Sequence, residues 1–355
     1  MTAASLTECS LPDQDVPATV APTPAARDGR ELIEASRPFA VEDLSRSVFA
    51  SVTTLGVLLT TLAGAVALPW WPARIASMVV AGLTIVRAFI LYHDVMHGAL
   101  FRGNSLTARV GRAFFSAFGV WVLTPPKVWK QTHNYHHAHT AKLVGSHVGS
   151  YLMLTPEMYK KATPAQRAVY RFMRHPLNMA LGYLTVFLWG MCLGPFLRAP
   201  RKLWDSLLAF VLHAVIVTAV WVTLGPTAVL TGVVGPYVIA FALGAYLFYA
   251  QHNFPGITVQ PRESWSYTRA ALESSSYLKT GPVMGWFTGN IGYHHVHHLN
   301  PTIPFYRLPE AMAAIPELQN PHTTSLAPRD VLACFELKLW DPTQGRMVGY
   351  EAVAE

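Results

Sequence analysis

Three clusters of closely spaced histidines are the part of this sequence best suited to binding a metal ion. One cluster has the pattern H-x-x-x-H, and two others have the pattern H-x-x-H-H. Residues three or four positions apart share one face of a helix, so each cluster directs two or three imidazoles toward a common point. A further histidine follows the last long apolar run. The nine candidates are His93, His97, His133, His136, His137, His252, His294, His297 and His298.

Nine converging imidazoles predict a metal site rich in nitrogen. Imidazole binds iron, zinc, copper and nickel, and the sequence has no closely spaced thiolates or carboxylates beside the clusters. The three cysteines, Cys9, Cys192 and Cys334, lie far apart. Nine ligands exceed the needs of one ion, so the count predicts two ions with four or five histidines each and open coordination positions. Iron combines redox chemistry with activation of dioxygen, although the residues alone leave zinc open.

Four of the other histidines have no partner at ligand spacing and are expected to be structural: His147, His175, His213 and His322. His139 and His295 lie beside candidate ligands but are out of phase with their clusters, so they are assigned neither role.

Polar residues beside the candidate ligands are candidates for orienting the imidazoles. A hydrogen bond at one ring nitrogen fixes the tautomer and leaves the other nitrogen free to bind metal. Asp94 is the best of these candidates, and capping of a helix end is the alternative role. The four candidates are Asp94, Asn134, Asn253 and Asn300.

The composition indicates that membrane-spanning helices position these clusters. Of the 355 residues 52% are hydrophobic and 13% are charged, whereas soluble domains carry roughly 25% charged residues. This balance excludes a disordered chain and argues against a soluble globular protein. Four apolar runs are long enough to cross a bilayer as helices. The predicted spans cover about 46–68, 74–92, 205–224 and 228–250.

Short connections join these spans into two predicted helical hairpins. The loop at 102–174 is rich in Lys and Arg and has one acid, Glu157, which places it in the cytoplasm. The N-terminus, the histidine clusters and the C-terminus are then also cytoplasmic. Two further apolar stretches, 113–123 and 179–197, are expected to lie along the membrane or to re-enter it. The net charge of +7 is attributed to these basic loops, and no nucleic-acid partner is expected.

The predicted fold class is an all-α integral membrane protein whose cytoplasmic helical cap carries the histidines. Residues 1–40 are expected to be a flexible tail rich in Ala, Pro and Thr. Residues 41–310 form the membrane domain, and 311–355 form a cytoplasmic C-terminal segment.

The three clusters resemble the histidine boxes of the membrane fatty acid desaturases. Those boxes are H-x(3,4)-H, H-x(2,3)-H-H and [HQ]-x(2,3)-H-H, and they match residues 93–97, 133–137 and 294–298. The resemblance covers roughly residues 45–310. The segments Gln-His-Asn-Phe-Pro at 251–255 and His-His-Leu-Asn-Pro-Thr-Ile-Pro-Phe-Tyr-Arg-Leu at 297–308 are similar to acyl-lipid desaturases of the Δ12/ω6 type.

The resemblance implies an oxidoreductase with a di-iron centre. Such an enzyme uses O₂ and two electrons to remove two hydrogens from an acyl chain, giving a cis double bond and water. It implies that the nine histidines bind the two irons, with His252 as the ligand outside the boxes. No His-Pro-Gly-Gly haem motif occurs in the sequence. We therefore expect electrons from a separate donor, either ferredoxin-like or cytochrome b5-like, and a membrane lipid or other acyl substrate.

Two alternatives stay open on the sequence. A hydroxylase or ketolase acting on acyl, alkane or carotenoid substrates would use the same histidine boxes. A metal carrier would need polar groups inside the spans, and these contain only Arg87 and His213. The sequence therefore favours an enzyme over a carrier.

Overall fold

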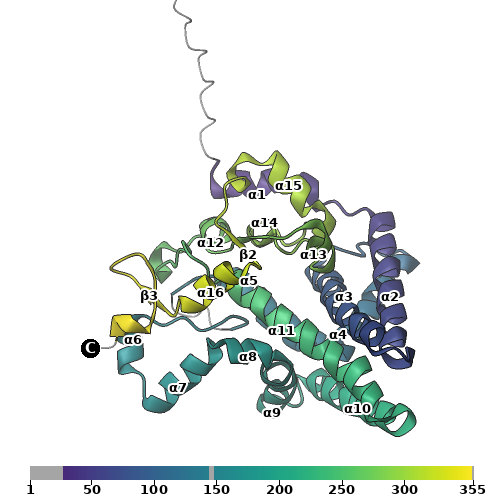
Figure 1. Ribbon diagram of the computed structural model, residues 1–355. Coiled ribbons are helices and arrows are strands. Elements are labelled where there is room, and N and C mark those ends of the chain that lie inside the picture. Colours follow the sequence, from purple (N-terminus) through teal and green to yellow (C-terminus); the bar gives the residue numbers. More distant parts are fainter. Residues whose placement is uncertain (1–26, 144–147, 354–355) are drawn as a thin grey trace, which may run out of the picture.

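The chain is mostly helical in the computed structural model, which describes residues 27–143 and 148–353 (Figure 1). Its long helices stand beside one another, and shorter elements cover one end of them (Figure 1). In the first half the helices are α1 (Gly29–Ser36), η1 (Arg37–Ala40), α2 (Leu44–Ala67), α3 (Trp71–His97), α4 (Leu106–Trp121), α5 (Pro126–His139), α6 (Pro156–Lys161), α7 (Pro164–Met173), α8 (Pro176–Ala180), η2 (Tyr183–Leu193) and α9 (Gly194–Arg198).

The second half contains the remaining long helices and all of the strands. Its helices are α10 (Trp204–Val229), η3 (Leu230–Val234), α11 (Gly235–Ala250), η4 (Arg262–Ser264), α12 (Tyr267–Glu273), α13 (Pro282–Phe287), α14 (His294–Leu299), η5 (Phe305–Arg307), α15 (Leu308–Ala314), η6 (Pro316–Leu318), α16 (Pro328–Glu336) and η7 (Tyr350–Val353). Its strands are β1 (Tyr277–Lys279), β2 (Thr323–Ser325), β3 (Leu339–Asp341) and β4 (Arg346–Val348).

Helices α2 and α3 form an antiparallel pair. Gly64 of α2 lies so close to Ser77 of α3 that a Cβ atom at Gly64 would be 2.7 Å from the serine Oγ. Further along the pair, Arg87 Nε donates a hydrogen bond of 2.9 Å to Thr54 Oγ1. The Arg87 guanidinium also lies 4.2 Å from the centre of the Trp286 ring. The charge in the middle of the predicted second span therefore faces protein, as expected for an ionisable group at membrane depth.

Helices α10, η3 and α11 form one apolar stretch of 47 residues, Trp204–Ala250. A straight helix would separate its His213 and Tyr237 by roughly 36 Å, yet their ring centroids are 5.2 Å apart. The chain therefore folds back on itself. Gly225 has φ 83° and ψ 174° and precedes Pro226, so the helix breaks there. The two runs predicted from the sequence, 205–224 and 228–250, lie on either side of this break.

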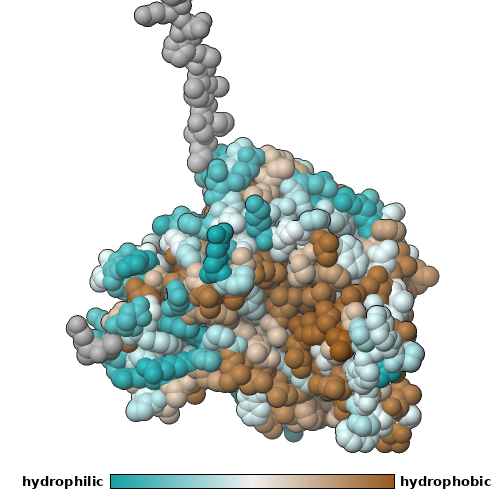
Figure 2. Space-filling view, viewed as in Figure 1, coloured by the Kyte–Doolittle hydropathy of each residue, from teal (hydrophilic) through white to brown (hydrophobic). Residues whose placement is uncertain are grey.

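Three helical stretches of the described chain are long and apolar enough to cross a membrane. They are α2, α3 and Trp204–Ala250, and a fourth is added if α4 and α5, bent by 93° at their junction, count as one. Exposed apolar side chains on these helices, such as Leu59 and Val222, fit a lipid surrounding. Figure 2 shows hydrophobic residues over the centre and lower right of one face and hydrophilic residues over its top and left. These features indicate a membrane protein.

The N-terminal segment is helical from Gly29, which corrects part of the predicted tail. Residues 1–26 of that tail lie outside the described residues. Asp28 caps α1 in a capping box with Glu31, and Leu32 is buried in the main core. Hydrophobic burial and a good N-cap together explain why residues 29–40 are structured.

Two small sheets correct the expectation of an all-α chain. Strand β1 pairs with β2 in parallel, and β3 pairs with β4 in antiparallel register. The expected domain boundary at residue 310 falls inside α15. Ile315 and Leu318 beyond that boundary belong to the same core as Val296 of α14, so the chain is continuous in packing across it.

We predict that replacing Arg174 by Ala destabilises the fold. Its buried guanidinium donates to Leu152 O at 3.0 Å, to Leu337 O at 3.4 Å and to Asn253 Oδ1. Leu337 O keeps a donor in Asn253 Nδ2, but Leu152 O and Asn253 Oδ1 lose theirs, which costs about 3 kcal/mol of unfolding free energy. A thermal melt in detergent measures the loss. The matched control is Arg329→Ala, whose side chain is 88% exposed; equal melting temperatures for the two variants would contradict the prediction.

Candidate metal centre

Three helices and one turn supply the nine candidate histidines. The first box ends α3, where Gly98 at φ 69° stops the helix in the left-handed region. The second box occupies the last turns of α5, and the third forms most of α14. His252 lies in the turn that follows α11. All three boxes therefore lie in helices, as the spacing argument requires.

The first group of histidines gathers residues from all three boxes. Their ligand nitrogens lie within 4.8 Å of one another. The Nε2 atom of His133 is 3.0 Å from that of His93 and 3.1 Å from that of His137. His137 Nε2 is in turn 3.1 Å from His297 Nε2. The members are His93, His97, His133, His137 and His297.

The second group contains the other four candidates. His252 Nε2 lies 3.0 Å from His136 Nε2 and 2.8 Å from His294 Nε2. His298 Nε2 completes the group at 3.1 Å from His294 Nε2. The structure thus brings together all nine residues singled out in the sequence and divides them into five and four. Among the described residues, neither group includes a Cys, Asp or Glu.

Hydrogen bonds at Nδ1 orient three of the imidazoles. His93 Nδ1 is 3.0 Å from Asp94 Oδ1, and His252 Nδ1 is 3.0 Å from the carbonyl oxygen of Ser274. His298 Nδ1 is 3.3 Å from Thr140 Oγ1. With the proton on Nδ1, the Nε2 lone pair of each ring points into its group.

The environment of both groups favours neutral imidazoles. Burial lowers the pKa of His252 to about 4. Burial and the neighbouring imidazoles hold the pKa of His298 well below its ordinary value. Neutral imidazole is the form that binds metal. Buried Nε2 lone pairs about 3 Å apart repel one another unless a proton or a cation lies between them, so the nitrogen set fits a transition-metal ion in each group.

Asp94 alone among the four predicted orienting residues contacts a candidate ligand. Its second oxygen, Oδ2, accepts a 2.7 Å hydrogen bond from the backbone N–H of Phe305. Asn134 is exposed, Asn253 bonds to Arg174 and to backbone carbonyls, and Asn300 bonds to Ser36 and Thr302.

Sequence reasoning missed two orienting groups, Thr140 and the carbonyl of Ser274. Thr140 lies three residues after the second box, which is a local signal, but its bond to His298 crosses between elements distant in sequence. Any residue supplies a backbone carbonyl, so the Ser274 contact leaves no trace in residue types.

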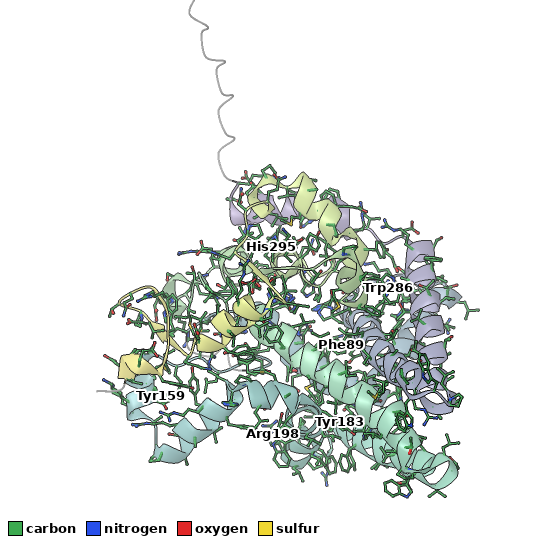
Figure 3. All side chains as sticks on the ribbon, viewed as in Figure 1. Phe89, Tyr159, Tyr183, Arg198, Trp286 and His295 are labelled. Atoms are coloured by element: carbon green, nitrogen blue, oxygen red, sulfur yellow. The ribbon has the colours of Figure 1, made fainter. Side chains whose placement is uncertain are left out.

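None of the described histidines outside the nine candidates belongs to either group. His139 bonds to the Tyr135 carbonyl, His295 bonds to the Leu318 carbonyl, and His213 bonds to the Tyr183 hydroxyl. Figure 3 shows His295 near the top of the molecule and Tyr183 near the bottom. The other two described are His175, which caps α8, and His322; His147 lies outside the described residues.

Aromatic side chains pack against both groups of histidines. Trp129 stacks on His133 with ring centroids 4.4 Å apart, and Phe89 packs edge-on against Trp129 at 5.0 Å. Phe248 lies 4.9 Å from His136. A cavity of about 20 Å³ borders the second group at His136, and a space of this size holds about one water.

Comparison with known proteins is consistent with this geometry. The family model described as fatty acid desaturase matches residues 69–329, a range that includes all nine histidines. A fatty acid desaturase of Bacillus subtilis is 33% identical over 281 residues, covering 79% of this chain and 78% of the relative.

Two more distant relatives have more specific names. An sn-1 oleoyl-lipid 12-desaturase of Synechocystis is 23% identical, with 79% of each chain covered. A chloroplastic sn-2 acyl-lipid omega-3 desaturase (ferredoxin) of Arabidopsis thaliana is 24% identical, with 76% of this chain and 61% of the relative covered. The family model and the relatives agree with the histidine boxes, and this chain belongs to the fatty acid desaturase family.

Proposed function

We propose that the protein is an O₂-dependent acyl-lipid desaturase that introduces a cis double bond with a histidine-bound di-iron centre. The observation that carries the proposal is the gathering of nine imidazoles, seven of which belong to buried residues, into groups of five and four. The family membership supports desaturation as the reaction. The five-and-four division supports two ions, because each group offers a nitrogen set that one ion can use.

The reaction explains why such a site is needed. An acyl methylene has no acidic proton, so acid, base or nucleophilic side chains cannot attack it. A bound iron pair supplies the oxidising chemistry by activating O₂. The residues of this chain hold the ions, orient the imidazoles through Asp94, Thr140 and the Ser274 carbonyl, and exclude water with Trp129 and Phe248.

The proposed substrate is the acyl chain of a membrane lipid. Two relatives are named for desaturation of oleoyl-lipid and acyl-lipid substrates. The long apolar helices adjoin the histidine groups, so an acyl chain reaches them without leaving an apolar medium. The proposed electron donor is a small carrier protein, and one relative's name includes ferredoxin.

The proposed topology has two membrane-spanning hairpins, α2 with α3 and α10 with α11. The antiparallel contacts of the first pair and the reversal at Gly225 support it. The basic segment 102–174 supports a cytoplasmic location for the histidine groups and for both ends of the chain. Residues 41–310 constitute the proposed membrane domain.

A fatty acid profile of an expressing host tests the proposed function. We expect gas chromatography with mass spectrometry to show a new unsaturated acyl species in lipids of cells making the chain together with a ferredoxin and its reductase. The species is absent with His298→Ala and present with His139→Ala, a histidine outside both groups. A hydroxylated product in place of an alkene would overturn desaturation.

Metal removal is predicted to destabilise the protein. Without cations, the converging nitrogens of both groups lose the ions that hold α3, α5 and α14 together. Iron at about a thousand times its dissociation constant stabilises the folded state by about 4 kcal/mol. We expect a chelator to lower the melting temperature in detergent, and ferrous iron to restore it. A melting temperature indifferent to both treatments would contradict iron binding.

A further inference from the structure

Thr140 links the second histidine group to the protein surface. Its side chain is buried directly after α5, and its Oγ1 donates a 2.7 Å hydrogen bond to the carbonyl of His136. That hydroxyl therefore accepts the 3.3 Å bond from His298 Nδ1. One residue thus contacts two of the four histidines in the group.

Trp265 continues this link outward. Its indole Nε1 donates a 2.9 Å hydrogen bond to the carbonyl oxygen of Thr140, and its side chain is partly exposed. The indole, Thr140 and His298 therefore form an unbroken series of covalent and hydrogen bonds from the surface to the second group. Backbone bonds from Gln260 to Ala141 at 2.9 Å and from Leu143 to Gln260 at 3.0 Å fix the two segments against each other.

Lys142 lies at the surface end of this series of bonds. Lys142 Nζ lies 4.4 Å from the centre of the Trp265 ring. Within the described part of the chain, no carboxylate forms an ion pair with Lys142. A positive charge over an electron-rich ring at the surface suits an acidic protein partner.

The hydrogen bonds that orient His93 and His252 do not lead to an exposed aromatic side chain. Asp94 leads from His93 to the backbone of Phe305, whose ring is buried, and Ser274 leads from His252 through its own hydroxyl to the carbonyl of Thr258. Of the three Nδ1 contacts, only the one through Thr140 is hydrogen-bonded onward to a partly exposed aromatic ring. Trp265 is therefore the partly exposed aromatic residue to which one of these three contacts leads.

We propose that electrons enter the protein at Trp265 and reach the second histidine group through Thr140 and His298. The donor is an acidic one-electron carrier protein that docks at Lys142. This inference rests on the proposed desaturase function. The reaction reduces O₂ to two waters with four electrons: two come from the two C–H bonds broken as the C=C bond forms, and two come from two carrier molecules, with two protons from solvent.

The test measures two quantities: the rate at which the protein-bound iron is reduced, and the amount of unsaturated acyl product that forms. Wild-type and variant proteins, loaded with ferric iron in lipid nanodiscs, are mixed without O₂ with a reduced plant-type ferredoxin, or with reduced methyl viologen as a small mediator. Stopped-flow absorbance records oxidation of each donor. Admitting O₂ and analysing the acyl chains then shows whether a double bond has formed.

We expect Trp265→Leu to slow electron transfer from ferredoxin by about tenfold, the scale of losses from outer contacts of metal ligands. The rate with methyl viologen should stay at the wild-type value, because this mediator does not depend on docking. Trp265→Phe, which keeps a ring and loses the Nε1 donor, should lie between Leu and Trp. The matched control is Trp204→Leu, since Trp204 also lies under a lysine, with Lys127 Nζ 4.7 Å from its ring.

A binding measurement supplies a readout independent of iron. We expect Lys142→Glu to weaken ferredoxin binding to the apoprotein, and the difference from wild type to shrink at high salt. Unchanged affinity at low salt would overturn docking at Lys142.

Each kinetic outcome bears on one proposal. A wild-type ferredoxin rate in Trp265→Leu would overturn entry at Trp265. Equal slowing with both donors, or loss of iron, would assign Trp265 a structural role and also overturn it. If wild-type protein accepts electrons yet forms no double bond with either donor, the proposed function fails while the entry route stands.

Discussion

Replacing His137 by Ala abolishes double-bond formation and lowers the iron content of the purified protein. Its Nε2 lies 3.1 Å from the Nε2 atoms of both His133 and His297, so this ring joins two boxes within the first group. Alanine removes that nitrogen and leaves a buried space that no other described ligand of the group fills. Fatty acid profiles and iron analysis of the same preparation measure the two losses together.

His139→Ala is the matched control for this prediction. His139 occupies the same helix, but its Nδ1 bonds to the Tyr135 carbonyl at 2.9 Å and its ring stacks on Tyr135. We expect wild-type activity and iron content in this variant. Full activity in His137→Ala, or equal losses in both variants, would contradict the assignment of His137 to a metal centre.

Asp94→Ala is expected to lower iron affinity and activity by about 10–100-fold, the usual cost of removing a partner of a metal ligand. The carboxylate accepts from His93 Nδ1 at 3.0 Å and from the Phe305 N–H at 2.7 Å. Alanine leaves both donors buried without an acceptor, so the His93 ring loses its fixed tautomer and orientation. Asp94→Asn retains one acceptor oxygen and should be less impaired.

The measurement is an iron titration monitored by absorbance, combined with the product assay at saturating iron. Asn134→Ala serves as control, because Asn134 also adjoins a candidate ligand and is exposed. If Asp94→Ala binds iron as tightly as wild type and keeps its activity, the carboxylate has no orienting role. Loss of activity in Asn134→Ala equal to that in Asp94→Ala would point to a general effect on folding.

The candidate ligands, and the helices that carry most of them, could be predicted from the amino-acid sequence. Metal-binding nitrogen is a property of residue type, and a spacing of three or four along a helix is a local constraint. Apolar runs of spanning length are also local, and so is the break expected at Gly225-Pro226. These features needed no knowledge of which helices pack together. The all-α expectation missed only short strands such as β1, whose pairing with β2 joins segments distant in sequence.

The division of the nine histidines into two groups could not be predicted from the sequence, because it depends on how the helices pack. His133 and His137, four positions apart, enter one group, whereas His136 enters the other. Likewise His294 and His298 stay together while His297 joins the first group. Positions four apart are offset by about 40° around a helix and positions three apart by about 60° in the opposite sense, so either pairing is allowed locally. The packing of α3, α5 and α14 selects between them, because it fixes which face of each helix meets its neighbours.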